Sequence, residues 1–319
     1  VCLEFSNMGH LQFIPGYFYD EGEDTFTGPE PEEVAFDLPD YSEMLSDERV
    51  RESAYWYEEK YMGTEGGTGG GDVYPELEHI DGKISYIKLP SFANSYVERD
   101  HDDITSWLKE HINDEAIILD IRGNGGGNGV YWYHNILPYL LNEDSISTSY
   151  GFISALPEDP DCAFLEDMRE KASPEEREMV YSLPRFEPSP VLDEAQLYKS
   201  TTMWPKDEEN CLGYEGKIYL LTDGGTGSAA ADFAYFCKES GFATIVGKTA
   251  NADGGGFGMT PVWFTLPNSR LPFMIRLSYS VMSDGSCGQV YGVEPDVYTE
   301  DDALEACLEI IKKGEQYAE

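Results

Sequence analysis

The chain of 319 residues carries a formal net charge of −40, because 61 acidic side chains outnumber 21 Lys and Arg. This charge excludes a conventional nucleic-acid binder, which needs a basic face for phosphate contacts, and argues against docking on an anionic membrane. A hydrophobic share of 41% is enough for a core, and the length corresponds to about two domains or one large domain with an extension.

The first part of the chain differs in composition from the rest. Residues 20–60 are very acidic and read as a solvated loop, whereas the glycine tract at 66–71 is typical of a flexible connection. We therefore predict an N-terminal segment at 1–72 and a core domain at 73–319. Within the core domain, the acidic and proline-rich residues 155–210 are predicted to form an inserted lobe.

The predicted elements of the core alternate between strands and helices. Apolar patterns predict strands at 83–89, 116–121, 217–222 and 243–246. Helices are predicted at 104–111, from the glycine turn to about 141 with a kink near Pro138, at 174–182, at 228–240 before Gly241, and at 301–313. A hairpin is predicted within 261–282. This alternation predicts an α/β fold with a layered core.

The sequence shows neither a membrane span nor a metal motif. No stretch approaches the roughly 20 apolar residues of a spanning helix, so we expect no stable membrane insertion. Val1 is not an initiator Met, which suggests that a preceding segment was removed and leads us to expect an extracellular or cell-envelope protein.

The six cysteines are widely scattered and form no Cys-x-x-Cys pair, which argues against a zinc site. We expect no metal and no cofactor. Cys237 and Cys307 fall in apolar helical patterns and are predicted to be core residues, while the disulfide pairing is left open.

The first motif with chemical potential directly follows the predicted strand at 116–121. It runs Asp-Ile-Arg-Gly-Asn-Gly-Gly-Gly-Asn over 120–128. Adjacent glycines let a backbone approach a ligand closely and expose its N–H groups, as an oxyanion hole or a phosphate cradle requires. A nucleotide-binding fingerprint is not present, and a tight strand-to-helix turn is the simplest alternative.

The second motif, Asp-Gly-Gly-Thr-Gly-Ser-Ala-Ala-Ala over 223–231, also follows a predicted buried strand. It places Ser228 at or near a helix N-terminus. The simplest interpretation is that Ser228 caps the helix. The functional interpretation is a nucleophile whose developing oxyanion faces free helix N–H groups.

Together the two motifs resemble those of the carboxy-terminal processing (tail-specific) serine proteases of serine peptidase clan SK, which include the tricorn core protease. The resemblance rests on Leu-Asp-Ile-Arg-Gly-Asn-Gly-Gly at 119–126, Ser-Ala-Ala-Ala at 228–231, Val-Gly-Lys-Thr at 246–249, Gly-Val-Glu-Pro-Asp at 292–296, and the opening strand with its flanks at 82–92. These segments follow the family's order and cover roughly residues 80–312.

The resemblance implies a ClpP/crotonase-like layered αβ core with Ser228 as the nucleophile. Backbone N–H groups near Gly125 or Gly126, together with that of Ala229, would form the oxyanion hole. It further implies that Asp120 and Arg122 are structural and that Asn124 shapes the glycine turn.

The general base distinguishes two branches of this family. In the Ser-Lys branch a lysine follows the serine by about 25 residues, but the corresponding loop here has none, and Lys248 is interpreted as a surface charge. The tricorn-like branch uses a histidine from an N-terminal segment. His10, which follows Gly9, resembles that residue, and His134 is the reserve candidate.

The other three histidines are given structural interpretations. His79 is placed on the surface, His101 is expected to cap a helix, and His111 is expected to close one, where its charge suits the helix dipole.

The third catalytic position departs from the family pattern. Members carry a Glu three residues before Gly-Val-x-Pro-Asp, where this chain has Gln289. A Gln can orient an imidazole through its carbonyl but cannot stabilise imidazolium as a carboxylate does. Asp284 and Glu294 are the alternative acids.

Three functions follow. The first is a serine-type endopeptidase that hydrolyses peptide or protein substrates through an acyl-enzyme on Ser228 with a His general base. The alternative is a catalytically weak or inactive relative that binds peptides or apolar ligands, which Gln289 and the absent lysine favour. A crotonase-type acyl-CoA enzyme is third, because the acidic composition disfavours CoA phosphates. The oligomeric state is left open.

Overall fold

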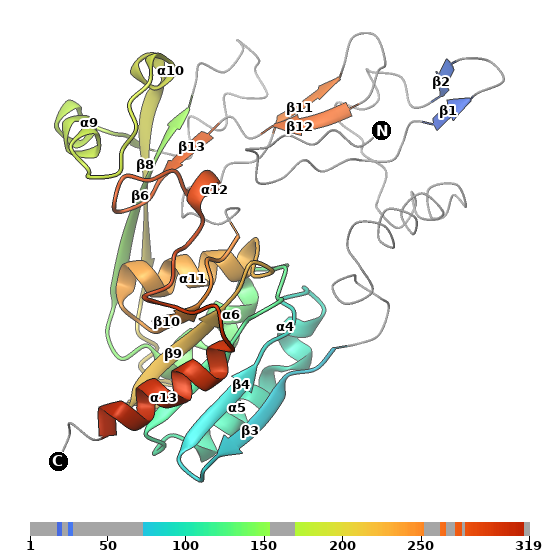
Figure 1. Cartoon of the computed structure of the whole chain (residues 1–319), viewed down its shortest axis with the longest axis vertical. Coiled ribbons are helices and arrows are strands. Elements are labelled where there is room, and N and C mark those ends of the chain that lie inside the picture. Colours follow the sequence, from blue (N-terminus) through green and yellow to red (C-terminus); the bar gives the residue numbers. More distant parts are fainter. Residues whose placement is uncertain are drawn as a thin grey trace. The chain divides into compact units, whose positions relative to one another are not determined.

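The computed structural model describes residues 73–153, 170–251 and 278–314, together with the backbone of Glu315 and of four short strands (Figure 1). The chain divides into two compact units. The first comprises residues 1–9, 73–258 and 278–319, and the second comprises 10–72 and 259–277. The predicted boundary at residue 72 stays a prediction.

Two antiparallel strand pairs belong to the second unit. β1 (Phe18–Asp20) pairs with β2 (Thr25–Thr27), and β11 (Val262–Thr265) pairs with β12 (Pro272–Ile275). The latter pair is the hairpin predicted within 261–282. The last strand of that span, β13 (Ser278–Val281), instead joins a sheet of the first unit.

A six-stranded sheet forms the centre of the first unit, with the order β14-β10-β9-β5-β4-β3. Only β3 runs antiparallel to its neighbour, so the fold is a mixed α/β architecture around a parallel sheet, as predicted. The strands are β3 (Glu76–Ile80), β4 (Ile84–Lys88), β5 (Ala116–Asp120), β9 (Lys217–Thr222), β10 (Thr244–Gly247) and β14 (Val297–Tyr298).

The central strands are apolar on both sides because helices cover both faces of the sheet. Every residue of β5 is buried, and its side chains alternate between two hydrophobic clusters. Ile117 and Leu119 pack against α5 (His101–Glu110) and α11 (Ala229–Ser240), and Ile118 packs against α13 (Ala303–Glu315). Figure 1 shows α13 on the opposite side of this sheet from α11.

The helix predicted from the glycine turn to about 141 is broken into two. α6 (Val130–Asn135) ends before Ile136, and α7 (Leu137–Leu140) has Pro138 in its first turn. A proline is tolerated there because first-turn N–H groups have no partner inside the helix. The interruption thus falls close to the predicted kink.

A second, four-stranded antiparallel sheet has the order β13-β6-β8-β7. Besides β13, the sheet consists of β6 (Ser145–Ile153), β7 (Glu170–Lys171) and β8 (Gln196–Trp204). Two helices, α9 (Pro174–Tyr181) and α10 (Pro190–Glu194), contribute to a separate small hydrophobic core with this sheet. This lobe contains residues of the predicted insert, but it also uses β6 and β13, which lie outside 155–210. The helix predicted at 174–182 is α9.

The described cysteines have no disulfide. Cys211, Cys237, Cys287 and Cys307 are free thiols, and Cys237 and Cys307 are fully buried, as predicted. Within the described ranges, helices are too short or too polar to cross a membrane.

Candidate active site

Two loops meet at the carboxyl ends of β5 and β9. The first, which we call the glycine corner, comprises residues 123–127, and the second, the serine turn, comprises residues 223–228. Gly227 N–H donates to the Asn124 carbonyl at 2.9 Å, and Gly123 N–H donates to Asp223 Oδ1 at 2.9 Å. Neighbouring parallel strands end at the same edge of the sheet, and these bonds hold the two loops together there.

Asn124 sets the shape of the glycine corner. Its side chain is fully buried, donates through Nδ2 to the Leu89 carbonyl at 2.8 Å, and accepts the Gly126 N–H through Oδ1 at 2.8 Å. One amide side chain therefore binds the corner to the residue that follows β4 and also to the corner's own backbone. This is the shaping role that the resemblance implied.

Asp120 and Arg122 form an ion pair beneath the corner. The Asp120 carboxylate is fully buried and accepts from Tyr86 Oη at 2.8 Å and from Arg122 Nη2 at 2.6 Å. Arg122 also bonds Asp302 at 2.9 Å, in front of α13. Burial, followed by the charge of Asp120, raises the pKa of Tyr86 above its usual range. These contacts join β4, β5 and the approach to α13, so the pair acts in the structure as a clamp.

Ser228 has an unusual backbone conformation directly before α11. Its φ is 50° and its ψ is −127°, and it is one of two non-glycine residues with positive φ in the part of the chain that the structure describes. Such a conformation is energetically unfavourable for a residue with a side chain, and strained residues cluster at functional sites. A sharp strand-to-helix turn that strains a serine is also how several hydrolases expose a nucleophile.

The Ser228 hydroxyl does not cap α11. No hydrogen bond joins it to the first helical turn, so the simpler capping interpretation is wrong. Among the described residues the hydroxyl has no hydrogen-bond partner at all, and the residue is partly exposed. Its side chain is therefore free for another role at the positive end of a helix dipole.

The glycine corner lies directly against this serine. A Cβ placed on Gly126 would come within 2.7 Å of Ser228 Cβ and 2.8 Å of Ala229 N. Gly126 also has a φ of +98°, so a side chain is excluded here both by space and by backbone conformation.

Three N–H groups were predicted as oxyanion donors, and their bonding differs. The Gly126 N–H already donates to Asn124 Oδ1. The N–H groups of Gly125 and Ala229 have no hydrogen-bond partner among the described residues, and Ala229 opens α11. A first-turn N–H of a helix has no partner within the helix, so it remains available to an anion.

The structure describes the predicted partner of the base, Gln289, but not the base itself. His10 lies outside the described residues. Gln289, on α12 (Gly288–Tyr291), bonds Ser280: its Oε1 accepts Ser280 N–H at 2.9 Å and its Nε2 donates to Ser280 Oγ at 2.7 Å. Its amide is thus anchored to β13, and Cys287 Sγ donates to the same Oε1 at 3.3 Å.

The alternative acids are already paired. Asp284 and Glu294 both bond Arg185, at 3.0 and 2.8 Å. Burial alone would raise the pKa of Asp284, but hydrogen bonds from Ser286 and the Arg185 charge outweigh it and lower the pKa. Both carboxylates therefore act as partners of one guanidinium.

The reserve base belongs to another group of residues. His134 stacks on His101 with ring centroids 4.5 Å apart, and its Nε2 lies 3.5 Å from Glu98. His101 does not cap a helix: it is the first residue of α5, and its Nδ1 is 2.8 Å from Asn135 Oδ1. Lys248 pairs with Glu300 at 2.9 Å and is well exposed, as predicted for a surface charge.

The strain at Ser228 and the free N–H groups could not be derived from the motif alone. Gly227 before the serine and Ala229 after it are the one available signal, because small residues permit the close approach of the glycine corner. The aromatic side chains Trp132 and Phe152 are buried in two different hydrophobic clusters.

Comparison with solved structures shows that other proteins share this fold. A putative peptidase from Parabacteroides merdae matches over 80% of this chain and 68% of its own, with a TM-score of 0.51 at 15% identity. The photosystem II D1 C-terminal processing protease matches over 72% and 45% (TM-score 0.40, 17% identity). Mature CPAF complexed with lactacystin matches over 76% and 54% (TM-score 0.45, 18% identity).

The sequence itself defines the family. The profile of peptidase family S41 matches residues 83–299, which is more than half of the chain and includes both the glycine corner and the serine turn. The chain belongs to peptidase family S41 and is a serine-type peptidase. The family predicted from the two motifs is thereby confirmed.

Proposed function

We propose that Ser228 is the nucleophile of an endopeptidase that works through an acyl-enzyme. One observation carries this proposal: directly before α11 stands a strained serine whose hydroxyl has no partner within the described ranges, and the backbone of Gly126 packs against it. A strained backbone lowers stability, and a hydroxyl without a hydrogen bond adds no stabilising contact. Both features suit a residue that must reach a substrate.

The N–H groups of Ala229 and of the glycine corner are the proposed oxyanion donors. Gly125 N–H and Ala229 N–H lack partners among the described residues, which supports them as the first pair. Gly126 N–H would join only by leaving Asn124. Donors fixed in place before the reaction stabilise the developing charge more than mobile water does.

His10 is the proposed general base, with Gln289 as its orienting partner. The Gly-His context supports this choice, as does the absence of a lysine from the loop about 25 residues after Ser228 in the sequence. In the reaction, Ser228 Oγ attacks the peptide carbonyl carbon while the imidazole takes the hydroxyl proton. The imidazolium then protonates the leaving amine, and water hydrolyses the acyl-enzyme by the same proton route.

A fluorophosphonate probe tests the nucleophile and the base separately. We expect one covalent adduct on Ser228, none in Ser228→Ala, and strongly reduced labelling in His10→Ala. Ser240→Ala is the matched control, because this serine ends the same helix, where its hydroxyl donates to the Phe236 carbonyl and accepts the Phe242 N–H. Labelling of Ser228→Ala at the wild-type rate would exclude the proposed nucleophile. Full labelling in His10→Ala would show that another residue is the general base.

A second function has a specific observation in its favour. Gln289 cannot balance an imidazolium, and its amide is engaged by Ser280 and Cys287. A weak or inactive relative that binds peptides would keep the scaffold without efficient turnover. Wild-type protein that forms no adduct and cleaves no peptide, yet binds peptide, supports this alternative.

The resemblance to tail-specific proteases leads us to propose chain ends as substrates. Matched peptides with a free or an amidated C-terminus test this step. Faster cleavage of the free-ended peptide supports tail specificity, and equal rates reject it without affecting the assignment of Ser228.

A further inference from the structure

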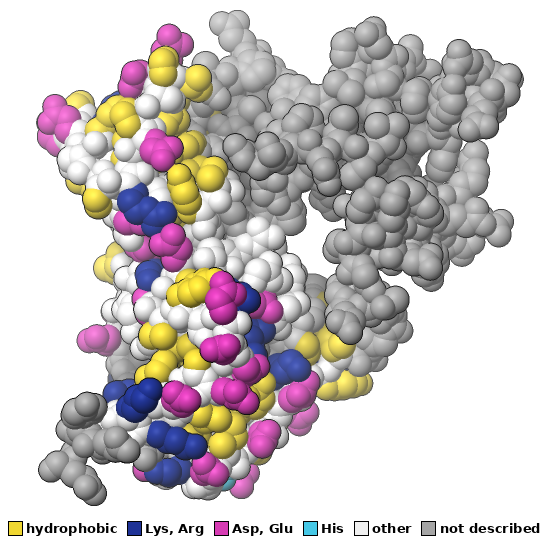
Figure 2. All heavy atoms as spheres, in the orientation of Figure 1, with side chains coloured by type: hydrophobic (Ala, Val, Ile, Leu, Met, Phe, Trp, Pro, Cys, Tyr) yellow, Lys and Arg dark blue, Asp and Glu magenta, His cyan; other side chains and the backbone are white. Residues whose placement is uncertain are grey.

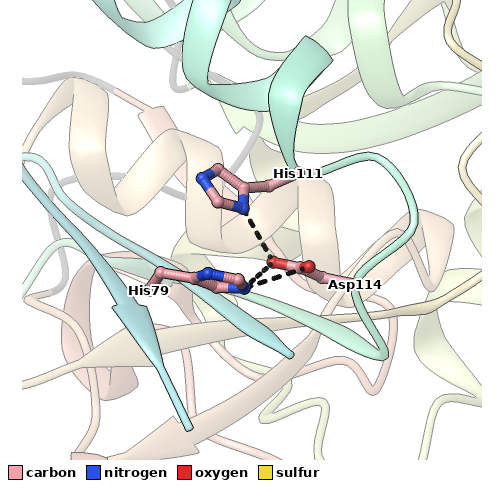
Figure 3. Close-up of side chains that lie close together, drawn as sticks. All are labelled: His79, His111 and Asp114. Carbon is pink, nitrogen blue, oxygen red and sulfur yellow. Dashed lines mark hydrogen bonds and ion pairs between the residues drawn. The ribbon is translucent and has the colours of Figure 1, made fainter. Parts of the chain in front are cut away.

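Two imidazoles and a carboxylate converge at the amino end of the central sheet. His79 lies on β3, His111 directly follows α5, and Asp114 lies in the turn before β5 (Figure 3). We call these three residues the His–Asp cluster. One ligand atom from each lies within 4.8 Å of the other two. His79 lies 32 and 35 positions before the other two residues, so no metal motif can be recognised from spacing in the sequence.

The separations fit a tetrahedral metal ion. His79 Nε2 lies 3.2 Å and His111 Nδ1 lies 3.3 Å from the same oxygen, Asp114 Oδ2. Zinc binds nitrogen and oxygen at about 2.0–2.2 Å, so two tetrahedral ligands stand about 3.3 Å apart. The pairs that involve Asp114 already have this separation.

Asp114 Oδ2 gives the second, independent sign of a ligand. This oxygen is buried and has no hydrogen-bond partner in the described part of the protein, although both imidazoles are near it. A buried carboxylate oxygen without a partner is costly, and a bound cation satisfies it directly. Figure 3 shows both rings directed toward this carboxylate.

The backbone around the cluster is fixed by hydrogen bonds. Asp114 N–H donates to the His111 carbonyl at 3.0 Å, and the buried Tyr214 hydroxyl donates to the Asp114 carbonyl at 3.1 Å. The Trp107 ring lies 4.1 Å from the His111 ring, and its Nε1 donates to Ser85 Oγ at 2.7 Å. Ligands held in this way lose little freedom on binding.

We propose that His79 Nε2, His111 Nδ1 and an Asp114 carboxylate oxygen bind one Zn²⁺ ion. Two imidazoles and one carboxylate form a donor set that suits zinc rather than Ca²⁺ or Mg²⁺, which take mostly oxygen ligands. Three protein ligands leave a fourth position for water. His111 and Asp114 are nearly buried, and His79, about one-third exposed, closes the site from the edge strand.

The role of this ion is to fasten the edge of the sheet. His79 is paired with Ser85 near the start of β4, whereas the serine turn follows the opposite end of β9. The length of β5, about 13 Å, therefore separates the His–Asp cluster from the serine turn along the strand direction. The ion therefore joins β3, the first strand of the sheet, to the end of α5, and takes no part in peptide hydrolysis.

A titration of tag-free protein with Zn²⁺ and with Co²⁺ tests the proposal. We expect one Zn²⁺ per chain by mass spectrometry of the native protein, a visible Co²⁺ spectrum of a low-coordinate nitrogen and oxygen site, and a rise in melting temperature with Zn²⁺. Asp114→Asn and His79→Ala should weaken Zn²⁺ binding by at least about 100-fold and abolish the Co²⁺ spectrum. The exposed His79 variant keeps the test valid if a buried variant fails to fold.

The control is His134→Ala, which removes an imidazole that also stands beside another histidine and a carboxylate. It should bind Zn²⁺ as the wild type does. Equal Zn²⁺ affinity in all variants would assign the binding to the acidic surface and overturn the proposal. No binding at micromolar Zn²⁺, or a preference for Ca²⁺, would also overturn it and leave the cluster as a set of contacts between two imidazoles and Asp114.

Discussion

The two ends of the central sheet carry different kinds of chemistry. At the carboxyl end, backbone groups and one hydroxyl converge: Gly126 packs against Ser228 and Ala229, and the N–H groups of Gly125 and Ala229 have no partner among the described residues. At the amino end, side chains converge instead: two imidazoles and a carboxylate approach one another on a backbone that hydrogen bonds hold in place. A reaction site thus presents backbone donors to a substrate, whereas the proposed ligand site gathers side-chain ligand atoms around one point.

Surface charge follows no such division. Figure 2 shows Asp and Glu scattered over the described surface, with Lys and Arg interspersed. Many of these cations pair with acids, as Lys88 does with Glu76 and Lys83 with Glu115. Exposed pairs of this kind contribute little to stability, so the two sheet ends, and not the surface, are where substitutions should have large effects.

The largest effect is expected for Gly126→Ala. Its Cβ would meet the Gly227 carbonyl at 2.6 Å and Ser228 Cβ at 2.7 Å, in a backbone conformation that side chains avoid. We expect peptidase activity to fall by at least about 100-fold, because a displacement of the nucleophile by an ångström has that cost, and stability to fall by about 3 kcal/mol.

Gly123→Ala distinguishes the effect of backbone strain from the effect of a clash with Ser228. Gly123 has a φ of +73°, but a Cβ there would have nothing within 4 Å. It should lose about 1 kcal/mol of stability through backbone strain and keep most of its activity. Equal kinetic losses in both variants would contradict a specific contact between the glycine corner and Ser228. Peptide turnover and urea denaturation measure the two effects.

The second prediction concerns the clamp beneath the glycine corner. Arg122→Ala leaves the fully buried Asp120 carboxylate with Tyr86 and a backbone N–H as its hydrogen-bond donors. Breaking a buried ion pair from one side costs about 3 kcal/mol or more. Denaturant unfolding should show this loss, and Lys199→Ala, which removes partly exposed pairs with Glu170 and Glu176 on the second sheet, should show a much smaller one.

The third prediction concerns the strain at Ser228 itself. Ser228→Gly removes the Cβ from a position with φ of 50°, and we expect stability to rise by about 1 kcal/mol while activity disappears. Ser228→Ala keeps the strain and loses a hydroxyl that has no partner among the described residues, so its melting temperature should stay near that of the wild type. A less stable Ser228→Gly variant would show that the conformation is not strained.

The sequence predicted the α/β core well because its signals are local. The runs at 116–121 and 217–222 are predominantly apolar, and β5 and β9 indeed lie between two helical layers. β3 and β6 were not predicted. β3 is an edge strand with mostly exposed residues, and β6 alternates between exposed and partly buried residues in its first half, so neither has a strong apolar pattern.

The site was predictable in part for a related reason. Ser228 and the glycine corner lie in turns directly after buried strands, and topology alone brings such turns together. The bond of Gly126 to Asn124 and the anchoring of Gln289 by Ser280 depend on side-chain rotamers that no spacing encodes. The His–Asp cluster needs three separate segments to meet, which explains why His79 and His111 were interpreted one by one.

The smallest effect is expected at the far end of the helix that Ser228 precedes. Burial raises the pKa of Glu239, near the C-terminus of α11, and the charge of Asp284 adds to this, although a hydrogen bond from Ser283 opposes it. The folded state therefore binds this proton more tightly than the unfolded state, whose pKa is near 4.5. Between the two pKa values, this residue's contribution to stability falls as the pH rises.

Glu239→Gln should remove that dependence. The variant should match the wild type below pH 4.5, where both side chains are neutral, and become modestly more stable than the wild type toward neutral pH. Asp232→Asn, at the first turn of the same helix, is the control: its acid favours the helix dipole, so its loss should lower stability slightly at neutral pH. Denaturant midpoints across this pH range measure both variants, and a wild-type curve that rises with the Glu239 titration would reverse the assigned sign.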